Sequence, residues 1–86
     1  MMKRIYQQAL DHINNDDWDA AHRLIQDYSD PLSCRIHGYL HWIEGDFGNA
    51  AYWYHRAGIA LPDNTLAEEL ALLHSAVRPV REPDDE

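Results

Sequence analysis

Cysteine and basic residues are scarce in this sequence of 86 residues. The single cysteine, Cys34, excludes an internal disulfide and is typical of a reducing compartment. Only seven residues are lysine or arginine, whereas fifteen are aspartate or glutamate, so the formal net charge is −8. A chain this acidic lacks the basic face that nucleic acids and anionic membrane surfaces require. We therefore expect neither of them as a partner.

Long apolar runs are also missing from the sequence. No stretch approaches the roughly 20 apolar residues of a membrane-spanning helix. No apolar run of signal-peptide length follows the basic residues Lys3 and Arg4, so we expect a cytoplasmic protein. Apolar residues still make up 45% of the chain, enough for a core. We predict one domain over residues 1–77 and a disordered acidic tail over residues 78–86.

Helical periodicity predicts an all-α fold. Apolar residues recur every three or four positions, between breaks rich in Asn, Asp, Gly and Pro. The expected helices cover residues 3–14, 17–28, 31–44, 47–60 and 65–77.

Glycines and caps mark the details of these helices. Gly38 lies inside helix 31–44, where it costs ~1 kcal/mol against alanine, so we expect a second helix to cross closely there. Gly45 stands where a left-handed residue ends that helix. Gly58 belongs to the apolar stripe expected on helix 47–60. Thr65-x-x-Glu68 forms a capping box before the last helix.

Several of these residues occur in one known pattern. Gly38 matches a glycine in the first helix of a tetratricopeptide repeat, and Gly45-Asp46-Phe47 matches its turn. The matches in the second helix are Ala50, Tyr54, Ala57 and Pro62. Residues 31–64 therefore resemble a tetratricopeptide repeat. Residues 2–30 resemble a degenerate earlier copy, with its matches at Asp17-Trp18, Ala21 and Ile25.

The resemblance implies five short antiparallel helices in a right-handed array, with the last helix as a solvating cap. It also implies a concave groove lined by the first helix of each hairpin, which here would carry Lys3, Tyr6, Arg35, Tyr39 and Trp42. Cations beside aromatic side chains would suit an acidic peptide end. Exposed Trp42 and Trp53 would also suit a protein contact. The predicted protein-binding residues are accordingly Arg35, Tyr39, Trp42 and Trp53.

Three residues of the repeat depart from the family pattern. Cys34, His37 and His41 stand where tetratricopeptide repeats prefer Trp, Leu and Tyr. His37 and His41 are one helical turn apart, and Glu44 follows at the next turn. Two imidazoles and a carboxylate at this spacing can share a divalent transition-metal ion.

Two interpretations of these histidines remain open. His37, His41 and Glu44 can form a metal or small-molecule site, to which His22 and His55 on neighbouring helices can contribute. The pattern is not the H-E-x-x-H pattern of metalloproteases, because Gly38 follows His37. Alternatively, these are core histidines, each bonded to a carbonyl, a tyrosine hydroxyl or an acid.

Catalysis has little support in the sequence. Cys34 lies one turn before His37, so a thiol and an imidazole can meet, but no third orienting group is visible. The run from His37 to Tyr54 also resembles one in small uncharacterised proteins of bacteria and fungi, which implies no chemistry. We expect a non-enzymatic protein-interaction module, which can also form a homo-oligomer. The alternative is a protein that binds a metal or small molecule through a His/Glu site on the second to fourth helices.

Overall fold

The computed structural model describes the backbone of residues 2–77 and the side chains of residues 4–77. Five α-helices and no strand make up this part of the chain. They are α1 (Met2–Asn14), α2 (Trp18–Ile25), α3 (Pro31–Ile43), α4 (Phe47–Arg56) and α5 (Leu66–Val77). The all-α prediction is confirmed. The predicted tail at residues 78–86 and the side chain of Lys3 lie outside the described residues.

Local capping explains where the helices begin. The Asp30 carboxylate accepts hydrogen bonds from the Ser33 backbone N–H (3.1 Å) and hydroxyl (2.7 Å), ahead of α3. The Asp46 carboxylate accepts from the Asn49 N–H in the same way, ahead of α4. The expected capping box before α5 is present. The Glu68 N–H donates to the Thr65 hydroxyl, and the Thr65 N–H donates to the Glu68 carboxylate.

Residues with positive φ end α3 and α4. Gly45 has φ of +83° after α3, as expected, and the Asp46 N–H then donates to the His41 carbonyl. Gly58 has φ of +89°, and the Ile59 N–H donates to the Tyr54 carbonyl. The expectation that Gly58 continues the stripe of α4 is therefore wrong. The helix ends at Arg56, not at residue 60, because Gly58 terminates it.

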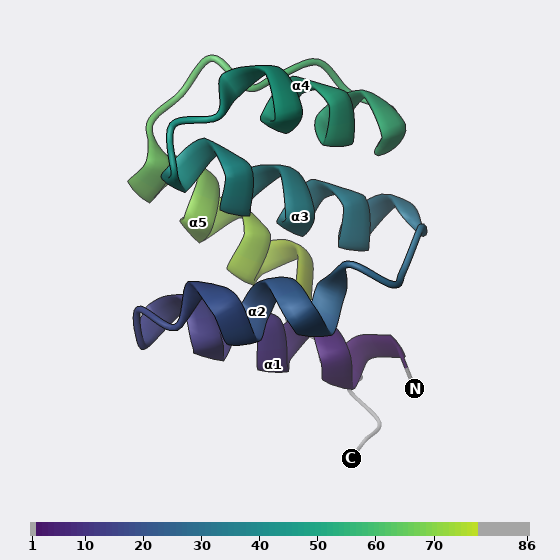
Figure 1. Cartoon of the computed structure of the whole chain (residues 1–86), viewed down its shortest axis with the longest axis vertical. Coiled ribbons are helices and arrows are strands. Elements are labelled where there is room, and N and C mark those ends of the chain that lie inside the picture. The colour runs from purple at the N-terminus through teal and green to yellow at the C-terminus, as the bar shows by residue number, and fades with distance from the viewer. Residues whose placement is uncertain (1, 78–86) are drawn as a thin grey trace, which may run out of the picture.

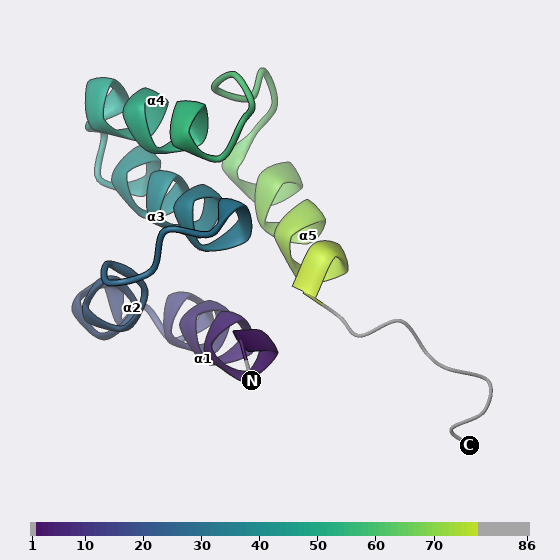
Figure 2. The same ribbon diagram turned by 90° about the vertical axis from the view of Figure 1, so that its right-hand side faces the viewer.

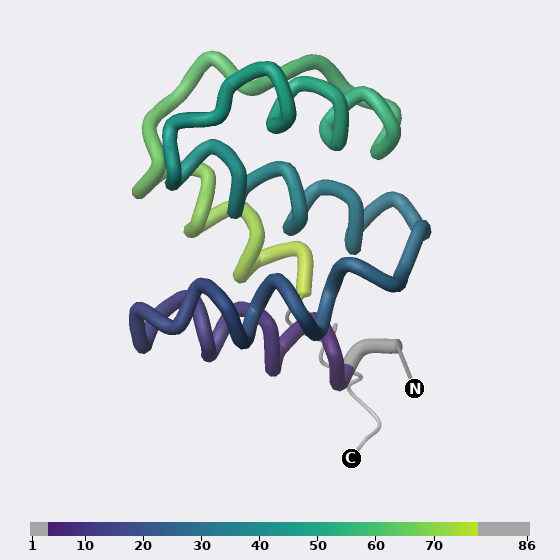
Figure 3. Tube along the Cα trace, in the orientation of Figure 1, coloured from purple at the N-terminus to yellow at the C-terminus, as the bar shows by residue number. Residues whose placement is uncertain are grey.

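Helix α2 is also shorter than expected, ending at Ile25 and not at residue 28. Asp30 must take extended backbone to cap α3 (φ −69°, ψ 158°), so the chain leaves the helical conformation before it. In Figure 1 the chain reverses direction at each of the three turns between α1 and α4, and Figure 3 shows the same path as a tube.

Helix α3 lies at the centre of the fold and contacts α1, α2, α4 and α5. Its crossing with α4 is close, as predicted, at Gly38. A Cβ added there would lie 2.7 Å from Cδ2 of Tyr54 and 3.2 Å from the Ala50 carbonyl oxygen. On another side, the Trp18 indole N–H donates to the Leu40 carbonyl at 2.7 Å, which anchors α2 to α3. The main core residues are Leu10, Ile25, Ile36, Leu40, Tyr54 and Leu73.

Helix α5 packs against α1 and α3. Figure 2 shows it beside these two helices, on the side away from α2 and α4. Leu73 and Val77 are buried at this contact. Glu69 is also fully buried and accepts from Arg35 at 2.9 and 3.3 Å, and from the Tyr54 hydroxyl at 3.0 Å. The groove expected along α1 and α3 is therefore filled by α5.

Candidate metal centre

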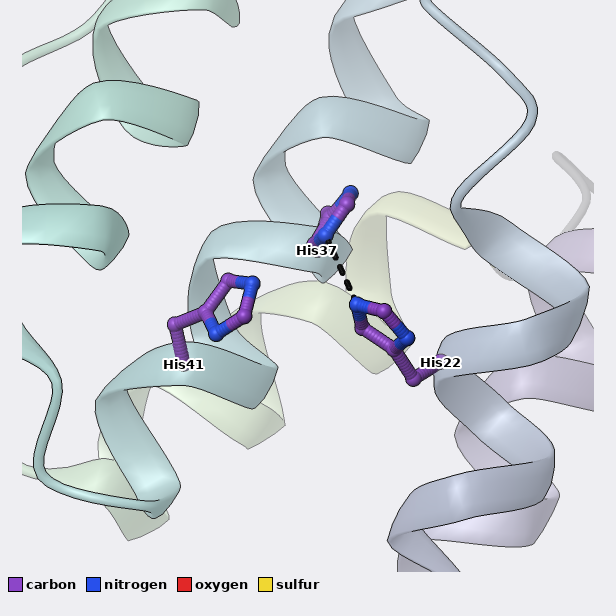
Figure 4. A group of neighbouring side chains, drawn as sticks. All are labelled: His22, His37 and His41. Atoms are coloured by element: carbon purple, nitrogen blue, oxygen red, sulfur yellow. Dashed lines mark hydrogen bonds between the residues drawn. The ribbon is translucent and has the colours of Figure 1, made fainter.

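Three histidines from two helices converge beside the centre of α3. His22 comes from α2, and His37 and His41 come from successive turns of α3. One ring nitrogen of each lies within 4.8 Å of the other two. Figure 4 shows the three imidazole rings gathered around a common point. The helical spacing brings His37 and His41 together, and the docking of α2 on α3 adds His22.

The distances are close to those of a metal site. A tetrahedral zinc ion with Zn–N bonds of about 2.1 Å holds its nitrogen ligands about 3.4 Å apart. The Nε2 atoms of His22 and His37 are 3.1 Å apart. The His41 nitrogen lies within 4.8 Å of the other two, so side-chain adjustments would have to bring it closer before the three nitrogens could surround one ion.

Glu44 prepares His41 for such a role. The Glu44 Oε2 atom lies 2.8 Å from Nδ1 of His41. An ionised carboxylate can only accept, so in a neutral His41 ring this contact places the proton on Nδ1 and leaves the Nε2 lone pair free. In Figure 4 a nitrogen of the His41 ring faces the other two rings. A carboxylate behind a ligating histidine is the usual arrangement in metal sites, where it orients the ring and raises its basicity.

His37 has no such partner. Its side chain is 4% exposed, and its buried Nδ1 has no hydrogen-bond partner among the described residues. Its Nε2 contacts only another imidazole, that of His22, and two facing nitrogens can share one proton but cannot both carry one. Buried polar atoms without partners are rare in native proteins and call for a specific explanation. The interpretation that each core histidine is hydrogen-bonded to a carbonyl, a tyrosine hydroxyl or an acid therefore holds for His41 but not for His37.

Burial favours the neutral forms of His37 and His22. Desolvation, reinforced by the neighbouring rings of His22 and His41, lowers the pKa of His37 from 6.5 to about 4. Desolvation and the nearby His41 also lower the pKa of His22, although Glu44 acts in the opposite direction. Neutral imidazole is the form that binds metals, so at neutral pH His37 and His22 need lose no proton to become ligands.

Two tryptophans hold the rings in place. Trp18 stacks on His22, with ring centroids 4.7 Å apart and an interplanar angle of 8°. Trp53 stacks on His37 at 3.8 Å and 16°. Each indole restricts the orientation of the imidazole on which it stacks before any ion binds. Metal binding therefore has less conformational entropy to remove. Trp18 had no assigned role in the sequence-based site.

The other candidate residues lie elsewhere. His55 is exposed on α4 and does not belong to the converging group. Cys34 is fully buried, and desolvation raises the pKa of its thiol, so it is not an activated nucleophile. A surface hollow contains none of the histidines and is lined by Ile13, Asp16, Trp18, Leu40 and Ile43.

The four residues predicted to bind a protein all make contacts inside the chain. Arg35 pairs with Glu69, and Tyr39 is 4% exposed and donates its hydroxyl proton to the Leu66 carbonyl. Trp42 is half-buried and packs edge-on against Tyr39 and Tyr54, and Trp53 covers His37. Among the side chains that the structure describes, the most exposed large apolar ones are instead Phe47, Tyr52 and Leu72.

None of the described helices has the length and apolar character needed to cross a membrane. Comparisons of the chain with protein-family models, with curated proteins and with solved structures found no match. The resemblance to tetratricopeptide repeats therefore stays a prediction from the residues alone.

Proposed function

We propose that this protein binds a divalent transition-metal ion, of the zinc class, through His22, His37 and His41. The observation that carries this proposal is the convergence of one nitrogen from each ring within 4.8 Å. Imidazole suits zinc, copper, nickel and iron and disfavours calcium and magnesium, which require oxygen ligands. Glu44 supports the site from behind His41 and is not itself a ligand.

Metal titration of the untagged, EDTA-treated protein tests this proposal. We expect one ion per chain by calorimetry and elemental analysis, and an increase in melting temperature with zinc. An ion at 100 times its dissociation constant stabilises the native state by about 2.7 kcal/mol. Cobalt or copper should also quench tryptophan fluorescence, because Trp18 and Trp53 stack directly on two of the ligands.

Matched variants separate the site from incidental histidines. His41→Ala and His22→Ala should abolish stoichiometric binding, whereas His55→Ala, which removes an exposed histidine outside the cluster, should leave it unchanged. Glu44→Gln should retain the site and weaken its affinity by about tenfold or more. Absence of zinc binding by the wild-type chain, or equal loss in the His55 variant, would reject the proposal.

The arrangement of the helices is the subject of a second proposal, which is that the chain forms two tetratricopeptide-like hairpins with antiparallel helices. Gly38 at the α3–α4 crossing and Gly45 with its positive φ support it, because the resemblance requires glycine at both. In such an array the groove along α1 and α3 binds peptides, and in this chain α5 occupies that groove. The single buried cysteine, Cys34, supports the cytoplasmic location.

A protein-interaction role is the second candidate function. It is favoured by one observation: the α1/α3 face holds an amphipathic helix whose Glu69 carboxylate pairs with Arg35. A partner helix of the same chemistry would replace α5. The Leu73→Ala variant weakens the chain's own α5 and serves as the receptor. A labelled peptide of residues 64–77 should bind this variant more tightly than a second peptide of the same residues that carries Glu69→Gln. No binding of either peptide would reject this role.

A further inference from the structure

The described chain supplies three ligands to the candidate metal centre and no fourth. Glu44 contacts Nδ1 of His41, on the opposite edge of the ring from the cluster, and Asp46 groups with these two residues and not with His22 or His37. Structural zinc sites are closed by four protein ligands, whereas a site with three protein ligands keeps one position for a ligand from solution. The geometry therefore describes an open centre.

Charge determines which kind of ligand suits the open position. Three neutral imidazoles leave the double positive charge of the ion uncompensated by the ligands themselves. Among the described residues, the carboxylate that hydrogen bonds to the cluster, Glu44, is already engaged with His41, and Asp46 and Asp19 lie only beside its edges. Arg56 adds a further positive charge. Its guanidinium carbon lies 4.8 Å from the ring centroid of Trp53, and this indole stacks on His37. A buried site with this charge attracts an anion more strongly than a neutral donor.

Access and shape limit the size of that anion. His37 and His41 are buried at 4% and 7% exposure, whereas His22 is only partly buried, so the α2 side is the more exposed side of the cluster. The indoles of Trp18 and Trp53 flank the cluster as apolar walls. Carboxylate oxygens are among the atoms that bind zinc in proteins. The ligand that fits is small, anionic and oxygen-donating.

We propose that the metal-loaded cluster takes a small oxyanion, a carboxylate or a phosphate, as its exchangeable fourth ligand. This inference rests on the proposed metal-binding function. It makes the protein a metal-dependent receptor for small anionic molecules.

Cobalt spectroscopy on the full, untagged chain tests the proposal. The visible bands of bound Co²⁺ report its coordination sphere directly. Acetate and acetamide form a matched pair that differs in charge and hardly in shape. We expect acetate, inorganic phosphate or both to shift the bands saturably, at an ionic strength held constant with perchlorate, and acetamide to leave them unchanged. The stronger of acetate and phosphate identifies the class of anion.

Arg56→Gln provides the second measurement, because Arg56 lies outside the ligand set. The variant should bind Co²⁺ with the bands of the wild type and bind the anion about two- to fivefold more weakly. Bands that respond to no oxyanion, or respond equally to acetamide, would overturn the proposal while the metal site itself stands. Failure to bind Co²⁺ at all would instead remove the proposed function and this inference with it.

Discussion

Mild acid should destabilise the metal-free protein through His37. The pKa of this buried ring is about 4 in the folded chain, because of desolvation and the neighbouring imidazoles of His22 and His41. In the unfolded chain the same ring titrates near its ordinary value of about 6.5. Between these two values the unfolded state binds a proton that the folded state does not. The stability contribution is therefore complete above pH 6.5 and is lost as the pH falls toward 4.

The size of this effect follows from the two pKa values. They differ by about 2.5 units, and each unit corresponds to roughly 1.4 kcal/mol, so the free energy of unfolding should fall by about 3 kcal/mol. Domains of this kind have a total stability of about 5–15 kcal/mol. A loss of this size is therefore readily measured.

Urea unfolding followed by circular dichroism, with EDTA present, measures the loss between pH 7 and pH 4. The His37→Leu variant keeps an apolar side chain against Trp53 and removes the titration, so it should lose about 3 kcal/mol less than the wild type. Carboxylates contribute equally to both chains and cancel in the comparison. His55→Gln, at an exposed histidine, should behave as the wild type. If the wild type and His37→Leu lost the same free energy of unfolding between pH 7 and pH 4, the role assigned to His37 would be refuted.

Three further substitutions test the packing that positions the cluster, each by urea unfolding. Gly38→Ala should lower the free energy of unfolding by about 1–3 kcal/mol, because its Cβ would lie 2.7 Å from the Tyr54 ring. The cost of this steric overlap exceeds the gain of about 1 kcal/mol in helix propensity. A stabilised variant would contradict the close crossing. Leu40→Ala should cost about 2–5 kcal/mol, because this fully buried side chain leaves a cavity, and a cost below about 1 kcal/mol would show that α3 is not central. Glu69→Ala should cost about 3 kcal/mol, because it leaves Arg35 and the Tyr54 hydroxyl without their acceptor; unchanged stability would mean that α5 is not held there.

Features governed by local chemistry could be predicted from the sequence. The positive φ of Gly45 and the reciprocal bonds of Thr65 and Glu68 depend on residues within one turn of the chain. The pairing of His37 and His41 follows from helical spacing alone, and the contact of His41 with Glu44 spans only three positions. Periodicity and capping carry this information directly.

Features that depend on long-range packing could not be predicted in the same way. His22 joins the cluster, and His55 does not, because α2 and α4 present different turns to α3, and neither rotation is encoded locally. Arg35 and Tyr39 looked available for a partner because nothing in the sequence reveals that α5 folds back over α3. Gly58 falls on the apolar stripe of α4, so periodicity alone could not distinguish a glycine inside the helix from one that ends it.

The residues of α3 that hold α2 and α4 in place lie on the same two turns of helix as its candidate metal ligands. Gly38 brings α4 close on one side, which places Trp53 over His37. The bond from the Trp18 indole to the Leu40 carbonyl holds α2 on another side, at the turn from which His22 points into the cluster. An ion held by all three histidines would therefore join α2 to α3 across their contact. Metal binding and the docking of α2 on α3 would then be one thermodynamic process, because the complete ligand set exists only when these two helices are docked.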